Sequence, residues 1–83
     1  MSFQNKVIKK YEEKGYDVIK VIRLNKSGYP DLICLKNGEA IFIEIKEGND
    51  TLKKLQKHRI DSLIKNGFKA FCLHDQKGII YPL

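Results

Sequence analysis

The chain has 83 residues, close to the smallest size at which a domain buries a useful core without a disulfide, a metal or a partner subunit. Sixteen lysines and arginines against ten acidic residues give a net charge of +6, which suits a polyanionic partner but does not identify one. Cys34 and Cys72 both lie in apolar runs, and no histidine cluster gives them the spacing of a zinc site. No secretory leader and no membrane-spanning apolar run is present. We therefore expect one domain over residues 1–83 of a cytoplasmic protein. Its two thiols are expected to be free, and a disulfide stays open if their strands are neighbours.

The first half of the chain predicts a helix followed by a strand. Residues 3–14 place Phe3, Val7, Ile8 and Tyr11 on one helical stripe with lysines elsewhere, and Gly15 ends the pattern. Residues 16–24, YDVIKVIRL, are rich in β-branched side chains and predict the first strand. The sequence NKSGYP that follows is typical of a turn.

The second half predicts a hairpin, a helix and two short strands. Residues 31–36 and 40–46 predict strands joined at Asn37-Gly38, a strong hairpin signal between apolar runs. Asp50 is a plausible N-cap for a helix over residues 51–66, which Gly67 would end. Residues 70–75 and 78–83 predict the last two strands. The order αβββαββ indicates an α+β fold with one mixed sheet flanked by two helices.

The hairpin register brings charges together at the end away from the turn. With Asn37 and Gly38 as the central turn residues, Asp31 lies opposite Glu44, where like charges repel. Strand alternation puts Glu44 and Lys46 on the same face. Two such carboxylates can share a proton, accept a salt bridge from Lys46, or chelate a hard divalent cation such as Mg²⁺. A cation held by Asp31 and Glu44, with Lys46 beside it, would suit phosphodiester cleavage, and a buried ion cluster that neutralises itself is the alternative.

These residues resemble a known family. Pro30-Asp31, twelve intervening residues and Glu44-Ile45-Lys46 resemble the PD-(D/E)XK nuclease signature. GYPDLI, IFIEIKEG and the later Gln56 are similar to its VRR-NUC branch, the small virus-type replication-repair nucleases. The resemblance implies a restriction-endonuclease-like αβββαβ core and a metal-dependent endonuclease that acts on DNA.

The resemblance also assigns roles. Asp31, Glu44 and the main-chain carbonyl of Ile45 would bind Mg²⁺ or Mn²⁺, and Lys46 would be the catalytic lysine. Gln56 lies within the apolar stripe Leu52, Gln56, Ile60 and Leu63 of the second predicted helix, where family members keep a glutamine beside the active site. Its alternative role is a core amide that bonds to the backbone.

One position departs from the family. Members usually carry an acidic residue near the start of the first helix, whereas the first eleven residues here contain none. Gln4 occupies roughly that region. Glu12, at the edge of the apolar stripe, is a possible substitute metal ligand, and it reaches inward more easily than Glu13. A missing ligand leaves the number of metal ions open.

The partner expected from this resemblance is DNA, branched forms such as four-way junctions included. The expected contacts come from the loop before Asp31 and from the second helix: Lys26, Ser27, Tyr29, Lys53 and Lys57. Binding through such cations weakens steeply with salt. A homodimer or a higher symmetric homo-oligomer would present two sites to two strands. The main alternative is a catalytically weak nucleic-acid-binding module that keeps the fold, and a third is a structural subunit; neither His58 nor His74 receives a role.

Overall fold

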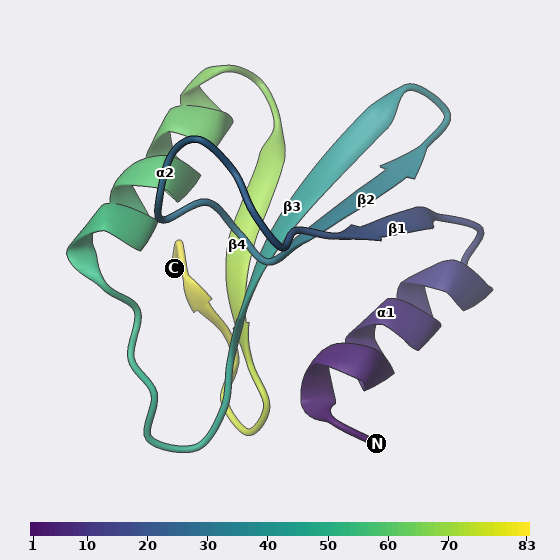
Figure 1. Ribbon diagram of the computed structural model, residues 1–83, viewed down its shortest axis with the longest axis horizontal. Coiled ribbons are helices and arrows are strands. Elements are labelled where there is room, and N and C mark those ends of the chain that lie inside the picture. The colour runs from purple at the N-terminus through teal and green to yellow at the C-terminus, as the bar shows by residue number, and fades with distance from the viewer.

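A computed structural model describes all 83 residues, and its element order is the predicted αβββαββ (Figure 1). The fold is α+β, with one five-stranded mixed sheet and two helices. Neither helix is long and apolar enough to cross a membrane. The elements are α1 (Phe3–Glu13), β1 (Asp17–Lys20), β2 (Leu32–Lys36), β3 (Glu39–Lys46), α2 (Lys54–Lys65), β4 (Lys69–His74) and β5 (Gly78–Tyr81).

The strands lie in chain order across the sheet. Only β3 and β4 are parallel, because α2 connects them as a crossover, and the other neighbours are antiparallel. Asn37 and Gly38 both have positive φ, at 50° and 79°, as a two-residue type I′ hairpin turn requires. This turn sets the predicted register, in which Leu32 pairs with Ile43 and Lys36 with Glu39.

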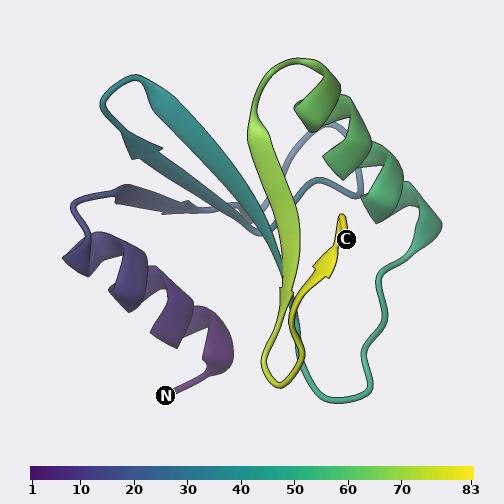
Figure 2. The ribbon, with the colours of Figure 1, turned by 180° about the vertical axis from the view of Figure 1, so that it is seen from behind.

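Each face of the sheet carries its own small core, and each core is covered by one helix (Figures 1 and 2). On one face, Val7 of α1 packs against side chains of β2 and β3. On the other, Ile60 and Leu63 of α2 pack against β4. Cys34 belongs to the first core and Cys72 to the second. Because β3 also separates their strands, the disulfide is excluded, and both thiols are free and buried.

Two predicted boundaries were wrong by three residues or more, and the last strand ends at Tyr81, two residues before the predicted end. The first strand ends at Lys20 and not at 24, because the chain leaves the sheet after a last backbone bond from Val21 N–H to the Asp31 carbonyl, at 2.8 Å. The second helix begins at Lys54, after Lys53 as N-cap, and not after Asp50. The Asp50 carboxylate pairs with Lys46 instead of capping a helix, and the chain stays non-helical until Lys53.

Candidate active site

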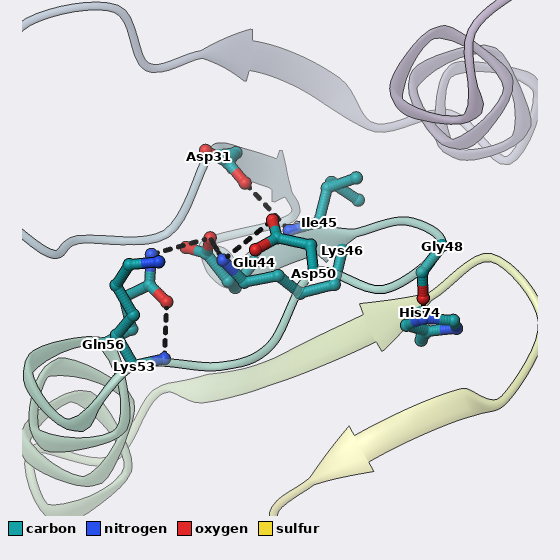
Figure 3. A network of polar contacts seen from close by, with 9 residues as sticks. All are labelled: Asp31, Glu44, Ile45, Lys46, Gly48, Asp50, Lys53, Gln56 and His74. Atoms are coloured by element: carbon teal, nitrogen blue, oxygen red, sulfur yellow. Dashed lines mark hydrogen bonds and ion pairs between the residues drawn. The ribbon is translucent and has the colours of Figure 1, made fainter.

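Asp31 lies where β2 begins, at the end of the hairpin away from the turn. The sheet pairing stops at Leu32, so Asp31 is not itself part of the ladder. Its Oδ2 accepts a hydrogen bond of 2.8 Å from the backbone N–H of Ile45 (Figure 3). The main-chain N–H of Ile45 therefore points toward Asp31. The N–H and C=O groups of one residue in an antiparallel pair point to the same edge of the strand, so the Ile45 carbonyl lies on this edge too.

Glu44 is almost completely buried, with 3% of its surface exposed. Burial and, to a smaller extent, the negative charge of Asp31 raise the pKa of its carboxyl group, and Lys46 partly offsets them, so that the pKa moves from 4.5 to about 8. The two carboxylates thus face each other as the hairpin register predicts. The desolvation of Glu44 outweighs the attraction of the nearby ammonium, so the Glu44 carboxyl group keeps its proton to higher pH than an ordinary glutamate does.

Lys46 is buried to a similar degree, with 4% of its surface exposed. Its Nζ lies 3.6 Å from Glu44 Oε2 and 3.4 Å from Asp50 Oδ2. Asp50 is half exposed, so it borders the site from the solvent side. This aspartate is a site residue that sequence reasoning assigned to a helix cap.

Gln56 joins α2 to the site. Its Nε2 donates to Glu44 Oε2 at 3.4 Å, and its Oε1 accepts from the backbone N–H of Lys53 at 2.9 Å (Figure 3). The second bond caps the start of α2, and it is one of the two hydrogen bonds that make up a capping box. The amide is therefore tied at one end to the backbone and at the other to a carboxyl group of the site. The structure thus shows the backbone bond of the alternative role and places the amide beside Glu44.

His74 holds the segment between β3 and α2 in place. Its Nδ1 accepts from the backbone N–H groups of Gln76 and Lys77, at 3.1 and 3.2 Å, which leaves Nε2 to donate to the Gly48 carbonyl at 2.8 Å. Asp75 Oδ1 accepts from Gly48 N–H at 3.2 Å. His74 and Asp75 thus bind both the carbonyl and the N–H of Gly48, and these bonds position the residues that lead to Asp50. Sequence reasoning gave His74 no role.

A second set of contacts from α2 holds the loop that leads into Asp31. Arg59 Nε donates to the Ser27 carbonyl at 2.9 Å, and its guanidinium lies 4.7 Å from the centre of the Tyr29 ring. Gly28 has φ of +82°, and a Cβ there would come within 2.7 Å of Leu55 Cγ. Arg59 follows Gln56 by three residues, so both lie on the same face of the helix. This spacing is the one sequence signal that could have identified Arg59 as a residue near the site.

The structure brings together only some of the predicted site residues. Asp31, Glu44, Lys46 and Gln56 converge, whereas Glu12 does not. Glu12 is exposed in the last turn of α1, on the opposite side of the sheet. The end of that helix contacts Lys36 at the hairpin turn, through a bond from Lys36 Nζ to the Lys14 carbonyl. The missing acid of the first helix is therefore not replaced by Glu12.

Of the five predicted nucleic-acid contacts, four are exposed and one is half buried. Lys26 and Ser27 are exposed in the loop beside Asp31, and together they line one hollow of about 310 Å³. Lys53 and Lys57 are exposed on α2, near Gln56 in the chain, although the Lys57 ammonium also lies 5.8 Å from the Tyr81 ring centre. Tyr29 is half buried, packs against the α2 core and has Arg59 over its ring.

The donor set suits a hard divalent cation with water-filled positions. No group of three or more His, Cys, Asp or Glu side chains is close enough to hold a metal ion. The fitting donors are the two apposed carboxylates of Asp31 and Glu44 and the Ile45 carbonyl. Mg²⁺ keeps several waters and commonly takes one or two carboxylates together with substrate phosphate oxygens, so this set fits it. Burial and then the charge of Asp31 raise the Glu44 pKa, and a cation bound there would offset both.

Comparisons with known proteins agree with this geometry. The sequence model of the VRR-NUC domain matches residues 3–76. A solved structure described as a VRR_NUC domain is similar over 83% of this chain and 76% of its own, at 28% identity and a TM-score of 0.72. The Holliday junction resolvase Hjc of Archaeoglobus fulgidus is similar in fold, with a TM-score of 0.67 at 17% identity, over 87% of this chain and 64% of the resolvase. No curated protein matches the sequence.

Proposed function

The chain belongs to the VRR-NUC domain family of the PD-(D/E)XK nuclease superfamily, and we propose that its residues 1–83 act as one metal-dependent endonuclease domain that hydrolyses DNA phosphodiester bonds. The proposed substrates are structured DNA forms, four-way junctions among them. The similarity in fold to a Holliday junction resolvase motivates that choice. The proposed cofactor is Mg²⁺ or Mn²⁺.

The observation that carries the proposal is the buried carboxyl group of Glu44, close to the partly buried carboxyl group of Asp31 and with the buried Lys46 beside it. The pKa of Glu44 is raised to about 8 mainly by burial, and Lys46 is held between Glu44 and Asp50. A fold that needed only stability would gain by replacing such a cluster with apolar side chains. A strained carboxylate pair therefore supports a catalytic use.

The proposed ligands are Asp31, Glu44 and the Ile45 carbonyl. When bound, the cation would lower the pKa of a coordinated water and polarise a phosphoryl oxygen. Water attacks the phosphorus atom and loses a proton, the bond from phosphorus to the leaving sugar oxygen breaks, and that oxygen gains a proton to become a hydroxyl group. The Lys46 ammonium orients the attacking water and stabilises negative charge that develops on the phosphoryl oxygens. Gln56 holds the Glu44 carboxyl through its Nε2, and the Ile45 N–H holds that of Asp31.

DNA is proposed to cross the site between the loop before Asp31 and α2. Lys26, Ser27, Lys53 and Lys57 are the proposed phosphate contacts, since all four are exposed. Tyr29 is proposed to support the loop and not to stack on a base, because Arg59 covers its ring.

Cutting two strands of a junction requires two sites, so we propose a homodimer or a higher symmetric homo-oligomer. A role in DNA repair and a location in the cytoplasm of a prokaryotic or phage-infected cell accompany the proposal. Both rest on the virus-type replication-repair branch that the sequence resembles.

The test is a cleavage assay on linear, flap and four-way DNA with Mg²⁺ or Mn²⁺. It compares the wild type with Asp31→Ala, Glu44→Ala and Lys46→Ala, and Glu47→Ala serves as an exposed control. The wild type and the control should cut, and the three site variants should not. Cutting by all three would refute the site. The alternative is a binding module without activity, favoured by the absence of an acidic residue in the first turn of α1, and it predicts binding without cutting under either metal.

A further inference from the structure

The segment that connects β1 to Asp31 exposes apolar side chains beside the candidate active site. Ile22 has 85% of its surface exposed and Leu24 has 52%, although each belongs to a run that reads as a buried strand. Single exposed aliphatic residues are ordinary on protein surfaces. These two alternate with Arg23 on one short segment, and the hollow of about 310 Å³ that this segment lines also contains Asp31.

This segment lies outside the sheet, and hydrogen bonds hold both of its ends. The backbone bond from Val21 N–H to the Asp31 carbonyl closes its base at 2.8 Å. Arg59 of α2 fixes its returning arm at the Ser27 carbonyl, so the loop lies toward α2 (Figure 1). The apolar tips are thus presented on a frame anchored at both ends.

The charge of the loop indicates what covers it. From Val18 to Pro30 the chain carries three cations, Lys20, Arg23 and Lys26, and no carboxylate. A second copy of this chain docked through the same loop about a twofold axis would bring these cations against each other. A polyanion would instead be attracted to them, and its bases offer apolar faces to the aliphatic side chains.

We propose that residues 21–27 form a branch-point contact. In it Ile22 and Leu24 insert against unstacked bases, and Arg23 and Lys26 bind the flanking phosphates. Aliphatic side chains act as wedges of this kind in proteins that bend or open DNA. At a branch the bases are already partly unstacked, so insertion there costs less than in a continuous duplex. This inference rests on DNA being the substrate, and it makes the loop the element that favours branched over linear DNA.

The test uses the full chain and the variants Ile22→Ser and Leu24→Ser. Ile79→Ser is the matched control, since Ile79 is 53% exposed on β5 and does not line this hollow. Binding is measured in chelator to a four-way junction and to a linear duplex with the same arm sequences. A 2-aminopurine at the branch, or at the same position in the duplex, reports unstacking.

We expect wild type and control to raise the fluorescence of the branch probe. Each loop variant should lose that rise and bind the junction about tenfold more weakly, the equivalent of one lost buried aliphatic side chain. Linear-duplex affinity and melting temperature should stay unchanged. An equal loss on both DNAs, no loss on either, or a wild type that binds no DNA would overturn the inference. So would a variant that shifts the mass in solution from two copies to one, because the loop would then be a protein interface.

These readouts need no cleavage, so they separate the two proposals. A wild type that binds and unstacks the branch but does not cut with Mg²⁺ or Mn²⁺ would refute the nuclease and leave the branch contact standing. A wild type that cuts while Ile22→Ser binds the junction as well as it does would refute only the branch contact.

Discussion

Replacing Glu44 by glutamine should change how the stability of the metal-free protein depends on pH. Burial, with the charge of Asp31 adding to it, raises the Glu44 pKa from 4.5 to about 8. Between these two values the folded protein keeps a proton that the unfolded chain has lost. The contribution of Glu44 to the free energy of unfolding is therefore fully present below pH 4.5. It falls as the pH rises, and its loss is complete above pH 8. Glu44→Gln keeps the shape of the protonated side chain and cannot ionise, so it should not show this fall.

The magnitude follows from the two pKa values. Within the window, the free energy of unfolding of the wild type should fall by about 1.4 kcal/mol per pH unit from this group alone. Between pH 5 and pH 7.5 the integrated loss is roughly 3 kcal/mol, after allowing for the curvature at both ends. That is a large part of the stability of so small a domain. The Glu44→Gln variant should thus become more stable than the wild type by about this amount as the pH rises.

The assay is urea unfolding in chelator at several pH values from 5 to 8, followed by tyrosine fluorescence or circular dichroism. The control is Glu47→Gln, an exposed carboxyl group three residues further along the chain. Its profile should run parallel to that of the wild type, because other titrating groups are common to both. If the profiles of Glu44→Gln and wild type are parallel as well, burial does not raise the pKa of Glu44 as proposed.

Adding Mn²⁺ should reverse the order of the two proteins. A cation that binds only the folded state stabilises it according to its concentration relative to the dissociation constant. The wild type should gain more at pH 7.5 than at pH 5.5, because binding must displace the Glu44 proton. Glu44→Gln lacks one carboxylate and should gain little at either pH. An equal gain in both proteins would show that the cation binds elsewhere.

Three further variants test how the site is held. Asp31→Asn should abolish cleavage, because it removes a proposed ligand. In chelator above pH 8, where Glu44 is ionised, it should also raise the melting temperature by removing the charge repulsion, and a lower melting temperature there would contradict the repulsion. Arg59→Lys keeps the charge but loses the Nε bond to Ser27, so the rise in melting temperature with Mn²⁺ should shrink beyond any change in the metal-free protein. An unchanged rise would limit Arg59 to a general stabilising role. Gly28→Ala should cost about 2 kcal/mol or more of unfolding free energy by chemical denaturation, from backbone strain and from the 2.7 Å approach to a leucine side chain. Gly67→Ala, with φ of +93° and open space around it, should cost less, and equal losses would exclude the steric contact.

The central part of the fold follows from local sequence signals. Asn37-Gly38 demands positive φ at both turn residues, and that requirement fixes the hairpin register. Once the register is fixed, the placement of Asp31 against Glu44 and of Lys46 on the same face is a matter of counting. These predictions were confirmed because no contact from a distant segment competes with the turn.

Predictions that depended on contacts between distant segments did less well. Asp50 has the composition of an N-cap, but the buried Lys46 ammonium attracts its carboxylate, and the helix begins four residues later. Residues 21–24 have the composition of a strand, but the next strand offers only one further backbone bond, at Asp31. His74 looked uncommitted in the sequence, since its distant partner Gly48 reaches it only when β4 lies beside β3. Its other partners, Gln76 and Lys77, are local.

The helix α2 contacts Glu44 and the loop that leads into Asp31, and these contacts have a consequence for the proposed chemistry. Gln56 reaches Glu44 directly, and Arg59, three residues along the same helix face, reaches the loop that ends in Asp31. The helix therefore supports, from the α2 side, the spacing that the hairpin register sets between the two carboxyl groups. The α1 side of the sheet contributes no acid. The proposed protein ligands are therefore this carboxylate pair and one carbonyl, so the other positions of a bound Mg²⁺ would be left to water and to phosphate oxygens of the DNA.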